Sequence, residues 1–184
     1  MRRVSVVGVS GSGKSRVARE LAARLSVPHV ELDAIYHQPG WAGLPVAEFR
    51  SRVADLVAGQ GWVIDGNYSA VQSLVWQHAD TVIWLDLPRR VFMSRIIWRT
   101  VRRVLFHEEL WNGNRERLGN LLSWNPGKSV ISWAWHHYPV YRQRYAAAAA
   151  DPLYGHLIFI HITSQAGADQ LLAAHQQEAS PGGC

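Results

Sequence analysis

The chain has 184 residues, of which 48% are hydrophobic and 18% are charged, and its formal net charge at pH 7 is +5. This composition is typical of a folded globular domain and excludes a disordered or low-complexity chain. The single cysteine, Cys184, excludes an internal disulfide framework and a cysteine-cluster metal site. Because no apolar stretch reaches about 18 residues and no signal-peptide pattern is found, we expect a cytoplasmic protein without a membrane partner.

Short apolar runs alternate with amphipathic segments along most of the chain. Strands are predicted at residues 3–8, 29–32, 62–64, 81–85 and 157–162, and helices at residues 16–25, 46–58, about 88–106 and about 166–175. Residues 36–45 are predicted to form a loop because of their Pro and Gly content. The alternation predicts an α/β fold with a five-stranded parallel sheet and helices on both faces.

One segment departs from this alternation. Residues 107–145 are rich in Trp, Asn, His and Arg, and we expect them to form a lid on a single domain whose core comprises about residues 1–106 and 146–178. The tail, residues 179–184, is expected to be disordered. Between residues 89 and 117, eight arginines stand against three glutamates, which accounts for the whole net charge. We therefore expect this segment to meet an anion, either nucleotide phosphates or a nucleic acid backbone.

The strongest motif is GVSGSGKS at residues 8–15, which fits the pattern G-x-x-x-x-G-K-[ST]. The glycines let the backbone wrap around an anion, and the following helix adds its positive N-terminal end. The motif predicts a nucleotide-phosphate loop in which Lys14 reaches the β- and γ-phosphates and the Ser15 hydroxyl binds Mg²⁺. The residues expected to contact the nucleotide are Gly8, Ser10, Gly11, Ser12, Gly13, Lys14, Ser15 and Arg16.

Three aspartates follow predicted strands, where ligands of such sheets bind. Asp65 is the expected magnesium ligand, directly or through water, because the turn after it exposes its carboxylate. For Asp86, which precedes Leu87-Pro88, we favour capping of the next helix over metal contact. Asp33 is expected to orient or deprotonate an acceptor hydroxyl, and the alternative is a turn aspartate bonded to its own backbone.

Two further residues are candidates for binding the acceptor, and four arginines for binding phosphate. Trp41 lies in the loop near Asp33 and is a candidate for stacking on the acceptor, and Asn67 is a candidate for contacting it. Because cations must follow the charge of the transferring phosphoryl group, four arginines are candidates for stabilising it. They are Arg95 and Arg99, which lie four residues apart on one helix face, and Arg142 and Arg144 at the far end of the lid. For each arginine, the alternative is a solvated charge or a surface ion pair.

The segments GVSGSGKS, ELDAIYHQPGW, WVIDGNYS and ADTVIWLDLPRRVFMSRIIWR together suggest a family. They resemble the P-loop kinases related to adenylate kinase, and more closely the bacterial DNA topology modulation proteins, over about residues 1–99. The resemblance implies a five-stranded parallel core, an acceptor-binding helical segment, a lid, and ATP with Mg²⁺. It also implies that Asp65 matches the aspartate of the adenylate kinase motif D-G-F-P-R, that Arg95 and Arg99 match paired arginines touching ATP phosphates, and that Arg50 matches an acceptor-phosphate arginine.

The chain departs from that pattern after Asp65-Gly66, where Asn67-Tyr68-Ser69 replaces the Phe-Pro-Arg of adenylate kinases. The missing arginine makes a neutral hydroxyl acceptor plausible, with Asp33 as its partner. Our first hypothesis is an ATP-dependent phosphotransferase that moves the γ-phosphoryl group to a small-molecule hydroxyl or phosphate acceptor, with a nucleoside or nucleotide favoured. The alternatives are a nucleotide-dependent DNA-binding regulatory protein, although we find no DNA-reading motif, and a plain ATPase.

Overall fold

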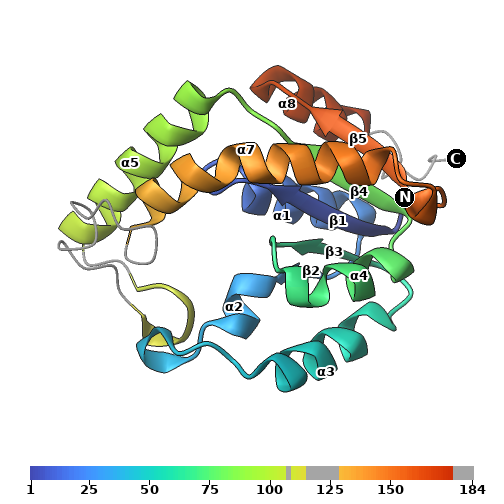
Figure 1. The fold of residues 1–184 in the computed structure, drawn as a ribbon, viewed down its shortest axis with the longest axis horizontal. Coiled ribbons are helices and arrows are strands. Elements are labelled where there is room, and N and C mark those ends of the chain that lie inside the picture. The colour runs from blue at the N-terminus through green and yellow to red at the C-terminus, as the bar shows by residue number, and fades with distance from the viewer. Residues whose placement is uncertain (107–108, 115–128, 176–184) are drawn as a thin grey trace, which may run out of the picture.

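In the computed structural model, which describes residues 1–106, 109–114 and 129–175, five parallel strands form one sheet (Figure 1). The strands are β1 (Arg3–Gly8), β2 (His29–Glu31), β3 (Trp62–Asp65), β4 (Thr81–Leu85) and β5 (Ile158–Ile162), and their order across the sheet is β2-β3-β1-β4-β5. The central strand β1 therefore places the start of the phosphate loop between the ends of β3 and β4.

Helices cover both faces of this sheet. They are α1 (Lys14–Leu25), α2 (Leu32–Tyr36), α3 (Val46–Val57), α4 (Ser69–His78), α5 (Arg89–Leu105), α7 (Val130–Ala149) and α8 (Gln165–Ala174), with short 3-10 turns at η1 (Pro39–Trp41), η2 (Trp111–Gly113) and η3 (Pro152–Tyr154). Residues of α1 and α8 pack on one face, and residues of α3, α4 and α7 pack on the other. The predicted fold class, α/β with a five-stranded parallel sheet and helices on both faces, is confirmed.

Alternate residues of the strands supply two separate hydrophobic cores, because successive side chains of a strand point to opposite faces. On β4, Ile83 packs in the core with α1 and α8, whereas Trp84 packs in the core with α4 and α7. Leu21 of α1 is fully buried on the first face and Phe49 of α3 on the second. Each such side chain contributes about 1.5–3 kcal/mol to folding. The two cores therefore fix the positions of the carboxyl ends of the strands.

Two elements differ from the predicted ones. The second strand ends at Glu31, and α2 begins at Leu32, so Asp33 lies in the first turn of a short helix rather than after a strand. Leu32 is buried in the core, and a carboxylate in the first turn of a helix is stabilised by the helix dipole. The helix α4 has no counterpart among the predicted elements. Its buried residues Val71 and Val75 lie four positions apart and pack on the sheet.

The expected lid is described only in part. α7 is one helix from Val130 to Ala149, so the boundary expected near residue 145 falls inside it. Tyr145 is buried in the main core beside Trp76 and Trp84. Residues 107–108 and 115–128 of the lid, and the expected disordered tail at 179–184, lie outside the described residues. Among the helices that the structure describes, none combines the length and apolar character needed to cross a membrane.

Candidate active site

The phosphate loop connects the end of β1 to the start of α1. Gly8, Gly11 and Gly13 have φ angles of +145°, +78° and +92°, a region that residues with side chains rarely adopt. The surrounding atoms also leave no room for a side chain at two of these glycines. A Cβ atom on Gly8 would lie 2.5 Å from the carbonyl oxygen of Leu85, and one on Gly11 would lie 2.5 Å from that of Phe92. The glycines therefore allow the loop to wrap closely against the end of β4 and against α5.

Lys14, the first residue of α1, turns its ammonium group back onto this loop. Its Nζ atom donates a hydrogen bond to the carbonyl oxygen of Val9 at 3.2 Å. Desolvation lowers the pKa of Lys14, the charges of Asp65 and Asp33 act in the opposite direction, and Arg99 adds to the lowering. A poorly solvated ammonium group of this kind gains from an incoming anion such as a phosphate.

Ser15 and Asp65, which the sequence predicts as magnesium ligands, are in direct contact. The Ser15 hydroxyl donates to Oδ2 of Asp65 at 2.6 Å, and the Asp65 side chain is almost fully buried. His29 at the start of β2 was not predicted as a site residue, and its Nε2 atom lies 3.3 Å from Oδ1 of Asp65. No cluster of three or more potential His, Cys, Asp or Glu metal ligands occurs within the described ranges. This donor set fits Mg²⁺, which usually takes one or two protein oxygens together with phosphates and waters.

Two of the predicted phosphate-binding arginines reach the phosphate loop. Arg99 donates through Nη2 to the hydroxyl of Ser10 at 2.9 Å. The Nη1 atom of Arg95 lies 3.5 Å from the place where a Cβ on Gly13 would stand, and its Nη2 donates to Oε1 of Gln165 at 2.7 Å. Both guanidinium groups thus lie beside residues of the phosphate loop, and their expected contact with phosphate stays a prediction.

Arg16, in contrast, points along the surface between α1 and α8. Its guanidinium group pairs with Asp169 at 2.6 Å and with Glu20 at 3.1 Å. These ion pairs raise the pKa of Arg16, with the hydrogen bond to Asp169 as the largest cause. The structure therefore does not bring the Arg16 side chain to the loop, and its expected contact with the nucleotide stays a prediction.

Asp33, the residue expected to orient the acceptor, is held by Tyr68, which sequence reasoning missed. The Tyr68 hydroxyl donates to Oδ1 of Asp33 at 2.6 Å and lies 3.3 Å from Nε2 of His37. Burial raises the pKa of Tyr68 far above its usual value, and the charge of Asp33 and the hydrogen bond to it raise the pKa further. Tyr68 therefore stays protonated and remains a donor to the carboxylate at all physiological pH values.

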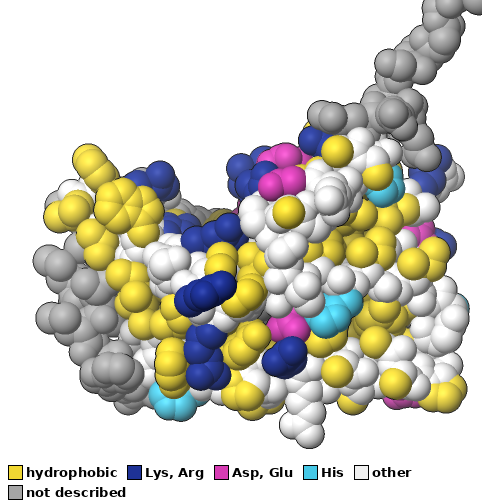
Figure 2. Space-filling model, turned by 90° about the horizontal axis from the view of Figure 1, so that it is seen from above, with side chains coloured by type: hydrophobic (Ala, Val, Ile, Leu, Met, Phe, Trp, Pro, Cys, Tyr) yellow, Lys and Arg dark blue, Asp and Glu magenta, His cyan; other side chains and the backbone are white. Residues whose placement is uncertain are grey.

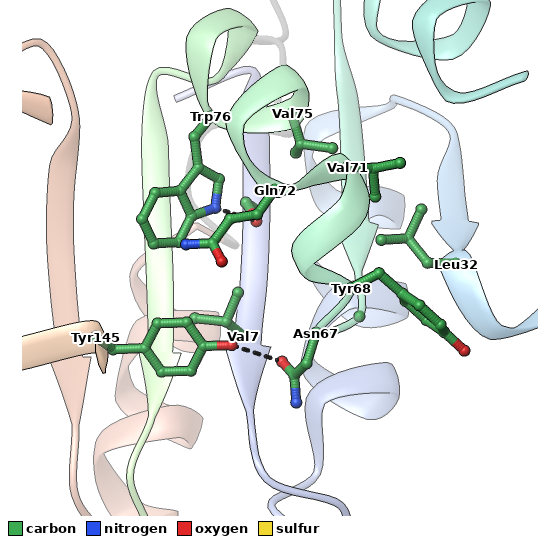
Figure 3. Close-up of a pocket in the computed structure, with 11 residues that line it drawn as sticks. Val7, Leu32, Asn67, Tyr68, Val71, Gln72, Val75, Trp76 and Tyr145 are labelled. Carbon is green, nitrogen blue, oxygen red and sulfur yellow. Dashed lines mark hydrogen bonds between the residues drawn. The ribbon is translucent and has the colours of Figure 1, made fainter. Parts of the chain in front are cut away.

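Asn67 joins the phosphate loop to the turn after β3. Its Oδ1 atom accepts hydrogen bonds from the backbone N–H of Gly8 at 3.2 Å and from the Tyr145 hydroxyl at 3.0 Å, and its Nδ2 atom donates to the carbonyl oxygen of Gly8. Figure 3 shows Asn67 and Tyr145 pointing toward one another among the residues that line a pocket between β1 and α4. The side-chain amide of Asn67 is thus hydrogen-bonded to Gly8 and Tyr145, and its expected contact with the acceptor stays a prediction.

Residues 110–114 of the expected lid lie against the loop after Asp33. The side-chain amide of buried Asn114 accepts from the backbone N–H of Trp41 at 2.8 Å and donates to the carbonyl oxygen of Gln38 at 3.0 Å. The Trp111 indole donates to Glu31 at 3.0 Å and stacks on His37. These residues of the expected lid therefore lie against the segment that carries Asp33 and Trp41, a contact that no local sequence pattern reveals.

The remaining candidates point elsewhere in the structure. Arg50 donates to the carbonyl oxygen of Ala70, and Arg144 donates to the side chain of Gln72. Arg142 pairs through Nε with Oδ2 of Asp86 at 3.0 Å, and Nε2 of His161 lies 3.1 Å from the same oxygen. The N-cap of α5 is Pro88, without a side-chain cap, so the capping interpretation of Asp86 is wrong. Its carboxylate instead fastens α7 and β5 to the end of β4.

On the face seen in Figure 2, hydrophobic side chains lie between the Lys and Arg side chains, so no unbroken basic surface is seen among the described residues of that face. Trp98 of α5 is 72% exposed, and Phe106, the residue directly after α5, is 73% exposed. Arg89 lies over the Trp135 ring of α7, with its Cζ atom 4.3 Å from the ring centroid. Part of the positive charge of this segment is therefore used to pack α5 against α7.

No protein-family model and no curated protein matches the chain. Among solved structures, it is similar to a shikimate kinase from Acinetobacter baumannii in complex with shikimate, with 18% identity, coverage of 97% of this chain and 92% of that chain, and a TM-score of 0.52. It is also similar to a shikimate kinase from Bacteroides thetaiotaomicron, with 15% identity, coverage of 96% and 97%, and a TM-score of 0.51. At these identities the likeness shows that the chain shares its fold with these two shikimate kinase structures.

Proposed function

We propose that this chain is an ATP-dependent phosphotransferase that acts on the hydroxyl group of a small, uncharged or weakly charged acceptor. The observation that carries the proposal is the position of Lys14. Its ammonium group lies within electrostatic reach of both Asp65 on the nucleotide side and Asp33 on the acceptor side. A phosphoryl group held at Lys14 would therefore lie between a metal-binding carboxylate and a carboxylate able to accept a proton.

In the proposed reaction, the phosphates of ATP lie on the glycine loop, and Lys14, Arg95 and Arg99 stabilise the transferring γ-phosphoryl group. Ser15 and Asp65 would hold Mg²⁺, which neutralises charge on the phosphates. Asp33 accepts the proton of the acceptor hydroxyl as the acceptor oxygen bonds to the γ-phosphorus. The bond between the γ-phosphorus and its bridging oxygen breaks, and ADP leaves.

The acceptor side favours a hydroxyl compound over a monophosphate. Ser69 stands where the resembled adenylate kinases have an arginine, and Tyr68 directly before it donates to Asp33. Arg50, the expected acceptor-phosphate arginine, donates to a backbone carbonyl on the surface. The neighbouring structures are named as shikimate kinases, one of them with shikimate bound, which supports a small hydroxylated acceptor. The lid contact at Asn114 supports a site that closes over its acceptor and excludes water. Membership of the DNA topology modulation proteins is a further proposal that rests on the resemblance.

The test is ADP release from Mg²⁺–ATP by the full chain, measured without acceptor and with a panel of nucleosides, nucleoside monophosphates and hydroxylated small acids such as shikimate. We expect one hydroxyl class to stimulate release strongly, and Lys14→Ala to abolish the stimulation. Equal release with every acceptor would contradict the proposal and favour the ATPase. In that event, salt-dependent DNA titration would test the nucleotide-dependent DNA-binding alternative.

A further inference from the structure

Asp33 can serve the acceptor only if its carboxylate is fixed in one orientation, and the structure shows how that is achieved. Oδ1 is bound by the Tyr68 hydroxyl at 2.6 Å, a length typical of a strong bond from a hydroxyl to a carboxylate. The bond joins the first turn of α2 to the residue directly before α4, which is 35 positions away along the chain. Two separate elements thus set the rotation of this carboxylate.

The bond network also fixes the direction of each hydrogen. Because the single phenol proton of Tyr68 points to Asp33, the phenol oxygen can accept a hydrogen bond from Nε2 of His37, 3.3 Å away, in the tautomer that carries its proton there. The chain of donors therefore runs from His37 to Tyr68 to Asp33. Each bond polarises the next, which strengthens the hold on the carboxylate.

The Tyr68 ring is itself held in place by aromatic packing. Its centroid lies 4.8 Å from that of Tyr36 and 5.2 Å from that of Phe49. The Trp111 ring of the lid segment stacks on His37 at 6.1 Å, so the far end of the donor chain is tied to the lid. The hydroxyl of Tyr68 is thus delivered to Asp33 by a rigid surrounding, and removal of that hydroxyl alone leaves the packing intact.

We propose that Tyr68, supported by His37, is a positioning residue that holds Oδ1 of Asp33 so that the other carboxylate oxygen faces the acceptor hydroxyl. This inference rests on the proposed function. Tyr68 acts through Asp33, and no contact between Tyr68 and the acceptor is required. A role of this kind lowers the rate of the transfer step when it is lost, and it leaves the affinity for either substrate nearly unchanged.

The test compares steady-state kinetics of Tyr68→Phe with those of the wild type, using the best acceptor from the ADP-release panel. We expect kcat to fall about 10–100-fold, because losing the orientation of Asp33 removes only part of the rate gained from general-base catalysis. The KM values for acceptor and ATP should stay within about 2-fold of those of the wild type. Tyr154→Phe is the matched control. Tyr154 lies in η3 and its ring packs on Trp76, away from Asp33, so this substitution should leave kcat unchanged. His37→Gln keeps an N–H donor and should retain more activity than His37→Leu.

A double-mutant cycle and a spectroscopic measurement separate positioning from a structural effect. Adding Tyr68→Phe to Asp33→Asn should cost no further activity, because the proton-accepting carboxylate that Tyr68 orients is already lost. Circular dichroism should show Tyr68→Phe folded like the wild type, so that a fall in kcat is not a loss of structure.

The outcomes are distinguishable. Unchanged kcat in Tyr68→Phe with an active wild type would overturn the inference and leave the phosphotransferase standing. A raised acceptor KM with kcat retained would show that Tyr68 binds the acceptor itself, which also overturns it. A wild type that no acceptor stimulates would remove the proposed function and this inference together.

Discussion

Asn67 offers the most direct test of how the fold supports the phosphate loop. Its side chain makes three hydrogen bonds, two with the backbone of Gly8 and one with the hydroxyl of Tyr145. Asn67→Ala removes all three bonds at once. Since each hydrogen bond contributes about 1 kcal/mol net, the expected loss of unfolding free energy is about 3 kcal/mol. For a domain of this size, that corresponds to a fall in Tm of about 6–12 °C.

Tyr145→Phe is the matched comparison, because it removes one of the three bonds and keeps the buried ring. We expect it to cost about 1 kcal/mol, or about 2–4 °C in Tm. The loop should also loosen at Gly8 in Asn67→Ala, so the KM for ATP should rise in that variant more than in Tyr145→Phe. Thermal unfolding by circular dichroism, together with ATP kinetics, provides both readouts. If Asn67→Ala is no less stable than Tyr145→Phe, the bonds to Gly8 contribute nothing and the reasoning is refuted.

Three further predictions concern charge and backbone strain. Lys14→Met should abolish activity with little loss of stability. Folding lowers the pKa of Lys14, so keeping this lysine charged reduces the stability of the folded wild type at neutral pH. Because this loss is relieved as pH rises toward 10.5, the wild type should gain Tm at alkaline pH, and Lys14→Met should lack the gain. Gly11→Ala should weaken ATP binding at least about 10-fold, since φ is +78° and a Cβ would collide with the Phe92 carbonyl; unchanged binding would refute this. Burial alone would raise the pKa of Asp80, but hydrogen bonds led by that from Arg3 outweigh it and lower the pKa. The ionised Asp80 therefore stabilises the fold above about pH 4, and this contribution is lost as pH falls. Asp80→Asn should therefore lose less Tm on acidification than the wild type does, and an equal loss of Tm in both proteins would contradict this.

Much of the fold can be predicted from the sequence because its strands are continuous apolar runs. Each of the five strands is short and three of them, β1, β3 and β4, are almost fully buried, so runs such as that of Thr81–Leu85 stand out against their polar surroundings. The phosphate loop can be predicted as well, because its chemistry lies in eight consecutive residues. Helix α2 has five residues, too few for a helical period to emerge, and this is why Asp33 was expected after a strand.

The rest of the candidate site depends on contacts between distant parts of the chain. Tyr68 meets Asp33 across 35 positions and Asn67 meets Gly8 across 59, and no local pattern predicts such pairs. Asp86 shows the same limit, because its place before Pro88 suggested a cap, whereas packing of α7 brings Arg142 to it. Contacts between side chains so far apart in the sequence depend on how the helices pack on the sheet.

The central claim is that the γ-phosphoryl group of ATP moves to a hydroxyl acceptor at Asp33. The most direct measurement follows γ-³²P-labelled ATP with the full chain, the best acceptor of the panel and Asp33→Asn as the comparison. We predict that the label appears in the phosphorylated acceptor and that Asp33→Asn loses this product while still binding ATP. Label released only as inorganic phosphate, or a product formed equally well by Asp33→Asn, would contradict the account.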